Sequence, residues 1–233
     1  MTPSIVAVLA IGGLLGFRHA FEPDHLAAVS TLASRPGSRL WSAARLGLIW
    51  GLGHTATVGV VALLIIVLGV QIPTRFWPAA ELLVAALLVL LGLAVIWRYV
   101  RGRWHMHAHA HPTAAPHFHL HNHTHDQTHG HTHAVVDARR SLGFGIAHGL
   151  AGSGAIAALL VAAVPDAASR LAYFAAFGAG TVAGMLSVSL TLSAVVRVAA
   201  ERSARLATIL HVGAAAASVV AGVVLAQQII SRP

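Results

Sequence analysis

The chain has 233 residues, of which 57% are hydrophobic and only 9% are charged, and its mean hydropathy is +0.75. A soluble domain carries about 25% charged residues, so this composition excludes an ordinary soluble enzyme and indicates a polytopic membrane protein. The net charge of +8 rests on 15 basic residues, all arginine. These arginines frame the apolar runs instead of lining one face, which disfavours nucleic-acid binding. The absence of cysteine excludes disulfides and thiolate metal sites.

Uncharged apolar runs predict about six transmembrane helices. Each run provides the roughly 20 residues that a helix needs to cross the hydrocarbon. The predicted spans are 3–33, 45–70, 78–98, 141–164, 171–196 and 206–230. The expected fold is therefore an all-α helical bundle in the membrane. It divides into a three-helix half over 1–100, a loop over 101–140 and a second three-helix half over 141–233.

The first span is predicted to be kinked and to carry a metal site. Its polar residues are Arg18, His19, Glu22, Pro23, Asp24 and His25, and apolar residues flank them on both sides. Ionisable groups at membrane depth usually pair, face a cavity or bind a ligand. Imidazole together with carboxylate suits nickel, cobalt, copper and zinc.

We therefore predict that His19, Asp24 and His25 bind metal, with Arg18 and Glu22 as accessory residues. On an unbroken helix His19 and Asp24 would lie about 140° apart, so we expect a break at Pro23 to bring them together. The alternative is a structural polar cluster in which Arg18 pairs with Glu22 at i,i+4.

Two further histidines lie inside apolar spans. His54 follows Leu52 and Gly53 in the second span and precedes Thr55, whereas His148 begins a glycine-rich segment of the fourth span. At about 1.5 Å of rise per residue, His19, His54 and His148 all fall roughly 8–13 Å from the cytoplasmic face. We therefore add His54 and His148 to the predicted ligands, with Thr55 and Ser153 as accessory residues. The alternative for each histidine is a hydrogen-bonded interior side chain.

The loop between the third and fourth spans is rich in histidine. Its histidines are His105, His107, His109, His111, His117, His119, His121, His123, His125, His129, His131 and His133. Such tracts bind metal by composition, so we predict a metal buffer or sensor of low selectivity in a polar, irregular loop. A flexible solvated linker is the alternative.

The distribution of arginine predicts the sidedness of the chain. Arginines concentrate in the first, third and fifth connections, and the positive-inside rule then places both termini outside and the histidine-rich loop in the cytoplasm. The chain is expected to be an integral protein of the cell membrane without a cleavable signal peptide.

Short internal similarities indicate a repeat. The segment Gly16–His19 resembles Gly145–His148, and three spans separate the two copies, which predicts two inverted three-helix halves with the site at their interface. The GxxxG pairs Gly12/Gly16, Gly47/Gly51 and Gly180/Gly184 predict close helix approach. Chance similarity among small residues is the alternative in both cases. His211, in the sixth span, is expected to be interfacial.

These motifs resemble those of the nickel/cobalt transporter superfamily. The segment from His19 to His25 matches that family's HX4DH signature, and Leu52-Gly53-His54 is similar to its LGH segment. The segment from His148 to Gly154 resembles that of the urease-associated nickel permeases. The resemblance implies that His19, Asp24, His25 and His54 take part in Ni²⁺ or Co²⁺ transport. A histidine-rich loop is similar to that of the family's efflux branch, so the direction of transport stays open.

The leading functional prediction is a secondary transporter with Ni²⁺ or Co²⁺ as its substrate and no organic cofactor. The chain is not expected to be an enzyme, and it has no Walker motif for ATP hydrolysis. Membrane potential slightly favours uptake; the alternative is efflux. More distant alternatives are a metal sensor or storage protein and an intramembrane serine protease that uses Ser153 and His211. Expected partners are the metal ion and the lipid bilayer, with a cytoplasmic metallochaperone or a second copy of the chain as further candidates.

Overall fold

The computed structural model describes residues 4–33, 40–73, 75–101, 105–111, 114–121, 138–151 and 166–232. Its labelled helices are α1 (Ile5–His19), α2 (Pro23–Ala33), α3 (Leu40–Ile66), α4 (Phe76–Val100), α6 (Ala167–Arg202) and α7 (Ala204–Ile230). Residues 138–151 form a further helical segment. Two strands, β1 (His105–His111) and β2 (Ala114–His121), lie between α4 and this segment.

The predicted helical membrane bundle is confirmed. Helices α3, α4, α6 and α7 are each long and apolar enough to cross a membrane. Helices α1 and α2 pass the same test as a pair, bent by 54° at a short break, so the predicted kink in the first span is confirmed. The predicted span 141–164 is helical as far as residue 151, and residues 152–165 lie outside the described part of the chain.

The break between α1 and α2 follows from the position of Pro23. Proline lacks a backbone N–H and suits the first turn of a helix, where no intrahelical acceptor exists for that donor. Before it, the N–H of Phe21 donates to the carbonyl of Arg18 at 2.9 Å, and that of Glu22 donates to the carbonyl of His19 at 3.0 Å. The turn therefore satisfies backbone groups that a lipid environment would leave unpaired.

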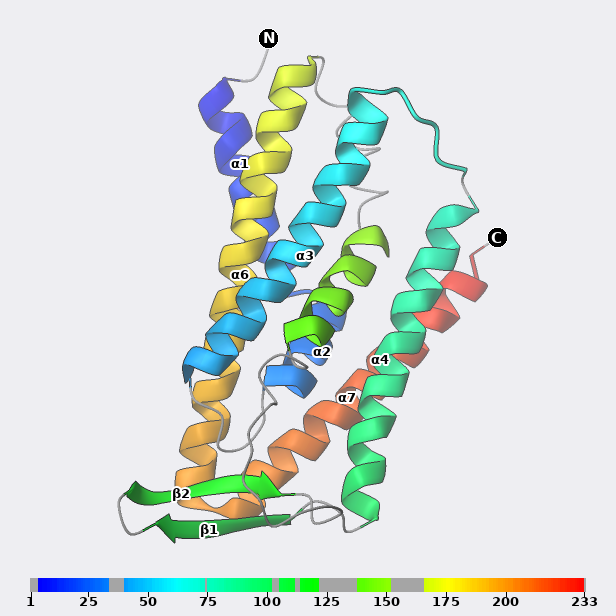
Figure 1. Cartoon of the computed structure of the whole chain (residues 1–233). Helices are drawn as coiled ribbons and strands as arrows, with labels where there is room; N and C mark the ends of the chain where they lie inside the picture. The colour runs from blue at the N-terminus through cyan, green and yellow to red at the C-terminus, as the bar shows by residue number, and fades with distance from the viewer. Residues whose placement is uncertain are drawn as a thin grey trace.

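Close contacts between helices hold the bundle together. Helix α6 packs along both α1 and α3, and α4 packs along α7 (Figure 1). Gly12 and Gly16 of α1 lie against the backbone carbonyls of Tyr173 and Phe177 in α6, where a side chain would not fit. The other predicted GxxxG glycines contact neighbouring helices as closely: Gly47, Gly51, Gly180 and Gly184. The predicted close approach is therefore confirmed.

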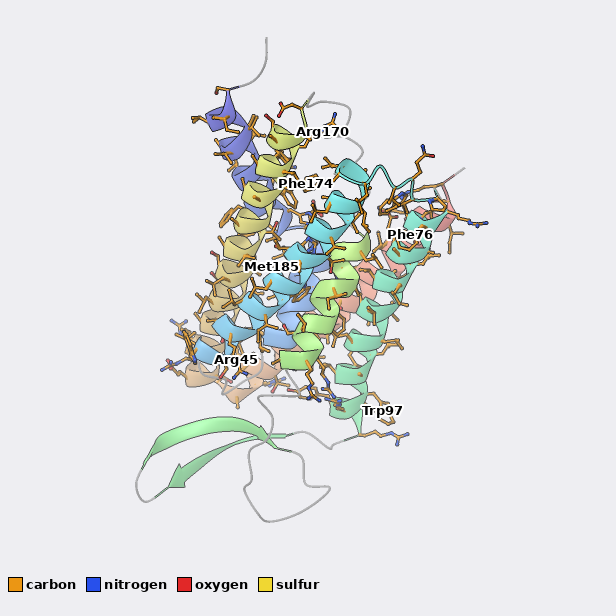
Figure 2. All side chains as sticks on the ribbon, turned by 45° about the horizontal axis from the view of Figure 1, so that its top comes forward. Arg45, Phe76, Trp97, Arg170, Phe174 and Met185 are labelled. Atoms are coloured by element: carbon orange, nitrogen blue, oxygen red, sulfur yellow. The ribbon has the colours of Figure 1, made fainter. Side chains whose placement is uncertain are left out.

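The α3–α4 connection and the start of α6 lie at one end of the bundle, and the strands and the turn between α6 and α7 lie at the other (Figure 1). Arg45 and Trp97 lie at the end nearer the strands, and Phe76 and Arg170 lie at the other end (Figure 2). At that other end Asp166 precedes α6 and accepts a hydrogen bond from the Ser169 N–H at 2.7 Å, which lowers the pKa of Asp166. The cytoplasmic placement of the strand end remains a prediction.

The histidine-rich loop contains more regular structure than the sequence predicted. Strands β1 and β2 pair antiparallel, and their register sets His105 opposite His121, His107 opposite His119 and His109 opposite His117. The expectation of an irregular loop is therefore wrong for these two segments. Histidine at every second position has the period of a strand, and this period outweighs the low β-propensity of a polar tract. His123, His125, His129, His131 and His133 lie outside the described residues.

We predict that Gly16→Ala destabilises the bundle. The added Cβ would overlap the backbone of Phe177, so α1 and α6 must separate. Overpacking of this kind costs about 1–3 kcal/mol, which thermal unfolding of the purified protein in detergent would show as a lowered Tm. Gly143→Ala is the matched control, because a Cβ added there would meet no neighbouring atom within 4 Å. Equal Tm values for the two variants would contradict the proposed packing.

Candidate metal centre

Three histidines from three parts of the fold meet beside the break in the first span. His19 ends α1, His25 lies in the first turn of α2, and His54 lies in the middle of α3. The ring centroids of His19 and His25 are 4.5 Å apart, and that of His54 is 5.2 Å from His19 and 5.4 Å from His25. One nitrogen from each ring lies within 4.8 Å of the others, a spacing that a single metal ion could bridge.

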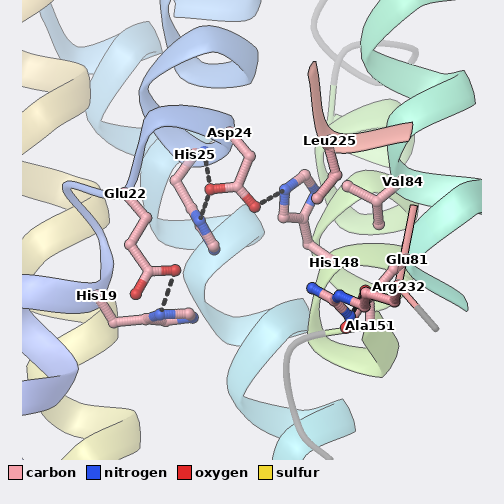
Figure 3. Close-up of a pocket in the computed structure, with 10 residues that line it drawn as sticks. All are labelled: His19, Glu22, Asp24, His25, Glu81, Val84, His148, Ala151, Leu225 and Arg232. Atoms are coloured by element: carbon pink, nitrogen blue, oxygen red, sulfur yellow. Dashed lines mark hydrogen bonds and ion pairs between the residues drawn. The ribbon is translucent and has the colours of Figure 1, made fainter. Parts of the chain in front are cut away.

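A second cluster shares His25 with the first. Asp24, His25 and His148 also bring one ligand atom each within 4.8 Å of one another. The Asp24 carboxylate lies between the two imidazoles, with Oδ1 3.0 Å from His25 Nδ1 and Oδ2 3.3 Å from His148 Nε2 (Figure 3). His148 comes from the helical segment 138–151, so this cluster joins the two halves of the chain.

Several imidazole nitrogens in these clusters have no hydrogen-bond partner among the described residues. They include Nε2 of His19, Nε2 of His25 and both ring nitrogens of His54. His54 is 1% exposed and His25 is 2% exposed. An unpaired buried polar atom costs about 1–3 kcal/mol, and such atoms in a folded protein call for an explanation such as a bound ion. These imidazole nitrogens lie on the cluster residues themselves, which favours metal binding over a purely structural network.

The predicted accessory residues have different surroundings. The carboxylate of Glu22 contacts Nδ1 of His19 at 3.0 Å, whereas Arg18 is exposed, and no ion pair joins Arg18 to Glu22 in the part of the chain that the structure describes. The alternative of an Arg18–Glu22 pair is therefore wrong. Thr55 donates to the carbonyl of Gly178 at 3.2 Å and so links α3 to α6. Ser153 lies outside the described residues.

Two aromatic rings flank the centre. Trp50 lies one turn before His54 in α3 and is 2% exposed. Its ring is stacked with His25 at 6.4 Å and edge-on to His148 at 5.7 Å. The ring of Phe177 in α6 lies 5.4 Å from His19. The i,i+4 spacing of Trp50 and His54 was the only sequence signal for Trp50.

A cavity of about 140 Å³ connects the clusters with a charged pair on α4 and the C-terminal end of the chain. Its lining residues are His19, Glu22, Asp24, His25, Glu81, Val84, His148, Ala151, Leu225 and Arg232 (Figure 3). Arg232 donates to the carboxylate of Glu81 at 2.7 Å. The cavity has room for several water molecules, so an ion could approach the clusters with part of its hydration shell. Neither Glu81 nor Arg232 was predicted from the sequence to belong to the site.

The donor set indicates which metals the centre suits. Neutral imidazoles favour nickel, cobalt, copper and zinc over magnesium and calcium, which prefer oxygen ligands. A carboxylate held on ligand imidazoles orients the rings and partly compensates the metal's charge. A family model described as NicO, high-affinity nickel-transport protein, matches residues 5–232. The chain belongs to this family of membrane transport proteins.

Comparison with a curated relative agrees with membership in the NicO family. The chain is 34% identical over 183 residues to the urease accessory protein UreH of Bacillus sp. (strain TB-90). The aligned region covers 78% of this chain and 75% of that protein. No solved structure matched the chain.

We predict that His54→Leu abolishes stabilisation by Ni²⁺ without lowering the stability of the metal-free protein. The substitution removes two unpaired ring nitrogens and keeps an apolar side chain of similar volume. A ligand at 100 times its Kd stabilises the folded state by about 2.7 kcal/mol, so thermal unfolding with and without Ni²⁺ would detect the loss.

Thr55→Val is the matched control, because it removes the hydrogen bond to Gly178 and leaves every imidazole in place. The loop histidines are unchanged in both variants, so they do not affect the comparison. A Ni²⁺-dependent rise in Tm for His54→Leu as large as that of the wild type would exclude His54 as a ligand.

Proposed function

We propose that the chain transports Ni²⁺, or Co²⁺, across the cell membrane by way of the two clusters that share His25. The observation that carries this proposal is the convergence of His19, His25, His54, Asp24 and His148 beside a broken helix, with unpaired ring nitrogens next to a cavity. Membership in the NicO family and similarity to a urease accessory protein support nickel as the cargo.

Each ligand has a distinct part in this proposal. His19 and His54 offer ring nitrogens to an ion on the α1 and α3 side of the site. Asp24 supplies negative charge and holds the rings of His25 and His148 in place. A transport site must bind its ion strongly enough to take it from water and weakly enough to release it. Three ligands in each cluster, with water completing the shell, meet both requirements.

The shared position of His25 provides a route between the two clusters. An ion bound by His19, His25 and His54 keeps its bond to His25 while Asp24 and His148 replace the other two ligands. Because His148 belongs to the second half of the chain, this exchange transfers the ion between the halves. No ligand leaves before another is within reach, which avoids the cost of a bare divalent ion inside the membrane.

Uptake is the favoured direction, and efflux is the second candidate. Membrane potential drives cations inward by about 2.3 kcal/mol per charge for each 100 mV, which for a divalent ion is a substantial force. The histidine-rich loop is the observation that favours efflux, since a cytoplasmic collector of metal would feed an exporter. In either direction the loop acts as a metal buffer, and its affinity falls when histidine is protonated near pH 6.

The alternatives from other functional classes receive less support. A sensor or storage protein would need only the loop and would leave the buried clusters without a role. A serine protease would need Ser153 and His211 together and would leave the same clusters unexplained. A metallochaperone that receives the ion and a second copy of the chain remain candidate partners.

The test is the nickel content of cells that express the chain, measured against cells with an empty vector. We expect a several-fold rise for the wild type and no rise for His19→Ala, because loss of one of three ligands costs most of the affinity. A His19-dependent fall would instead establish efflux. No difference for nickel, followed by none for cobalt and zinc, would overturn the proposal.

A deletion of residues 105–133 separates transport from sensing. A transporter that uses the buried centre keeps part of its flux without the loop, whereas a sensor loses its function. Thr55→Val serves as the control for expression and membrane insertion, since Thr55 anchors α3 to α6 without contributing an imidazole. Loss of all flux in the deletion at normal membrane abundance would move the essential site to the loop.

A further inference from the structure

The two halves of the chain repeat one helix contact. Gly16 of α1 lies against the backbone carbonyl of Phe177 in α6, and Gly145 lies against the backbone carbonyl of Trp50 in α3. The helical segment 138–151 therefore packs on α3 as α1 packs on α6. In this correspondence residue 16 is equivalent to residue 145, and residue 50 is equivalent to residue 177.

The surroundings of two histidines follow the same correspondence. His19 lies three residues after Gly16, and its ring is 5.4 Å from Phe177. His148 lies three residues after Gly145, and its ring is 5.7 Å from Trp50. Each histidine thus has an aromatic neighbour at an equivalent position in the other half. Sequence similarity between small residues would not by itself produce this agreement.

The contact between α3 and α6 maps onto itself when equivalent residues of the two halves are exchanged. Gly51 of α3 packs against Val182 of α6, and Gly178 of α6 packs against Thr55 of α3. Residue numbers rise along α3 as they fall along α6, so the two helices are antiparallel. A contact that maps onto itself with reversed direction is the property of a twofold axis between inverted halves.

The contacts between α4 and α7, the last helices of the two halves, show which of their residues are equivalent in the region of the cavity. Gly92 of α4 lies against the carbonyl of Ala215 in α7, and Gly222 of α7 lies against the carbonyl of Ala85 in α4. Residue 85 is therefore equivalent to residue 215, and residue 92 is equivalent to residue 222. The same register makes Glu81 the equivalent of His211.

The two equivalent residues differ in exposure. The side chain of Glu81 lines the cavity, pairs with Arg232 and is 23% exposed (Figure 3). His211 is 3% exposed, and its ring lies 5.9 Å from Tyr99. Because α4 and α7 are antiparallel, these residues lie towards opposite ends of the bundle. The structure is thus open beside Glu81 and closed beside His211.

We propose that His211 lines the second mouth of the metal path, as the twofold equivalent of Glu81 at the first mouth. When each half adopts the conformation that the other half has in this structure, the cavity beside Glu81 closes and one opens beside His211. An imidazole at that mouth offers a nitrogen donor where the first mouth offers a carboxylate. This inference rests on the proposed function for the identity of the ion, and on the twofold register for the place of the mouth.

The position of the antiparallel pair of strands β1 and β2, here called the hairpin, agrees with the placement of His211 at the second mouth. Strand β1 contacts α7, and the hairpin lies at the end of the bundle where α7 begins (Figure 1). His211 lies in the first part of α7. The histidine-rich loop therefore emerges at the same end as the proposed second mouth, where it would collect or receive ions that pass His211.

Labelling of single cysteines tests the inference. The natural chain has no cysteine, so Glu81→Cys and His211→Cys are the only reactive thiols in their variants. A charged, membrane-impermeant methanethiosulfonate is added to right-side-out and to inside-out membrane vesicles. We expect each variant to react at least about ten times faster from one side, and the preferred side to be opposite for the two variants.

Matched controls come from the same register. Leu90 and Val220 are equivalent positions with 63% and 62% exposure on the apolar outside of the bundle, so Leu90→Cys and Val220→Cys should not react from either side. Ala214→Cys, one turn from His211, replaces His211→Cys if that variant fails to fold. Reaction of His211→Cys and Ala214→Cys from the same side as Glu81→Cys, or from neither side, would overturn the inference.

The outcome is separable from that of the proposed function. If the two cysteines are labelled from opposite sides but expression of the chain does not change cellular nickel, the second mouth is supported and nickel is refuted as the cargo. Nickel transport together with unreactive His211→Cys and Ala214→Cys would support the cargo and refute the second mouth.

Discussion

The break between α1 and α2 is the feature on which the rest of the site depends. It places the end of one helix and the start of another inside the apolar bundle, with His19 on one side and Asp24 and His25 on the other. A continuous helix would spread these side chains around its circumference. Because Pro23 has no N–H, and the N–H groups of Phe21 and Glu22 donate to carbonyls of α1, the break leaves fewer backbone donors to be paired.

Close helix packing at glycines brings the histidines beside the break to their partners on other helices. Helix α1 approaches α6 so closely at Gly16 that backbone meets backbone, and this contact holds His19 beside His54 and Phe177. The same kind of contact at Gly145 carries His148 to Asp24. Helix association in lipid depends on such packing because no hydrophobic force drives apolar helices together there. The site is therefore assembled by the same contacts that assemble the bundle.

The sequence predicted the spanning helices and most of the cluster because both leave local signals. Apolar runs set the helices, and the charged interruption near Pro23 marked the kink. The depth of His19, His54 and His148 was predictable from rise per residue, and the structure brings all three to one region. Trp50, Glu81 and Arg232 were not predicted because their roles depend on how distant helices cross. The strands were not predicted because the polarity of the loop indicated irregular structure, although its histidines recur with a period of two.

The contact of Glu22 with His19 shows where prediction from sequence spacing alone fails. The i,i+4 rule predicts an Arg18–Glu22 pair on an ideal helix. The helix ends at His19, so Glu22 turns to His19 instead and Arg18 remains exposed. A rule for a regular helix fails where the chain leaves the helix, and in the first span the ionisable groups lie at that point.

The most direct test of the buried metal centre is nickel X-ray absorption on the purified chain after its loop histidines are replaced by serine. We expect a coordination shell dominated by imidazole nitrogen, with fewer nitrogen ligands in the His54→Leu variant. A shell of oxygen ligands alone, or a spectrum that is unchanged when His19, His25 and His54 are all replaced, would contradict the assignment of these residues as ligands.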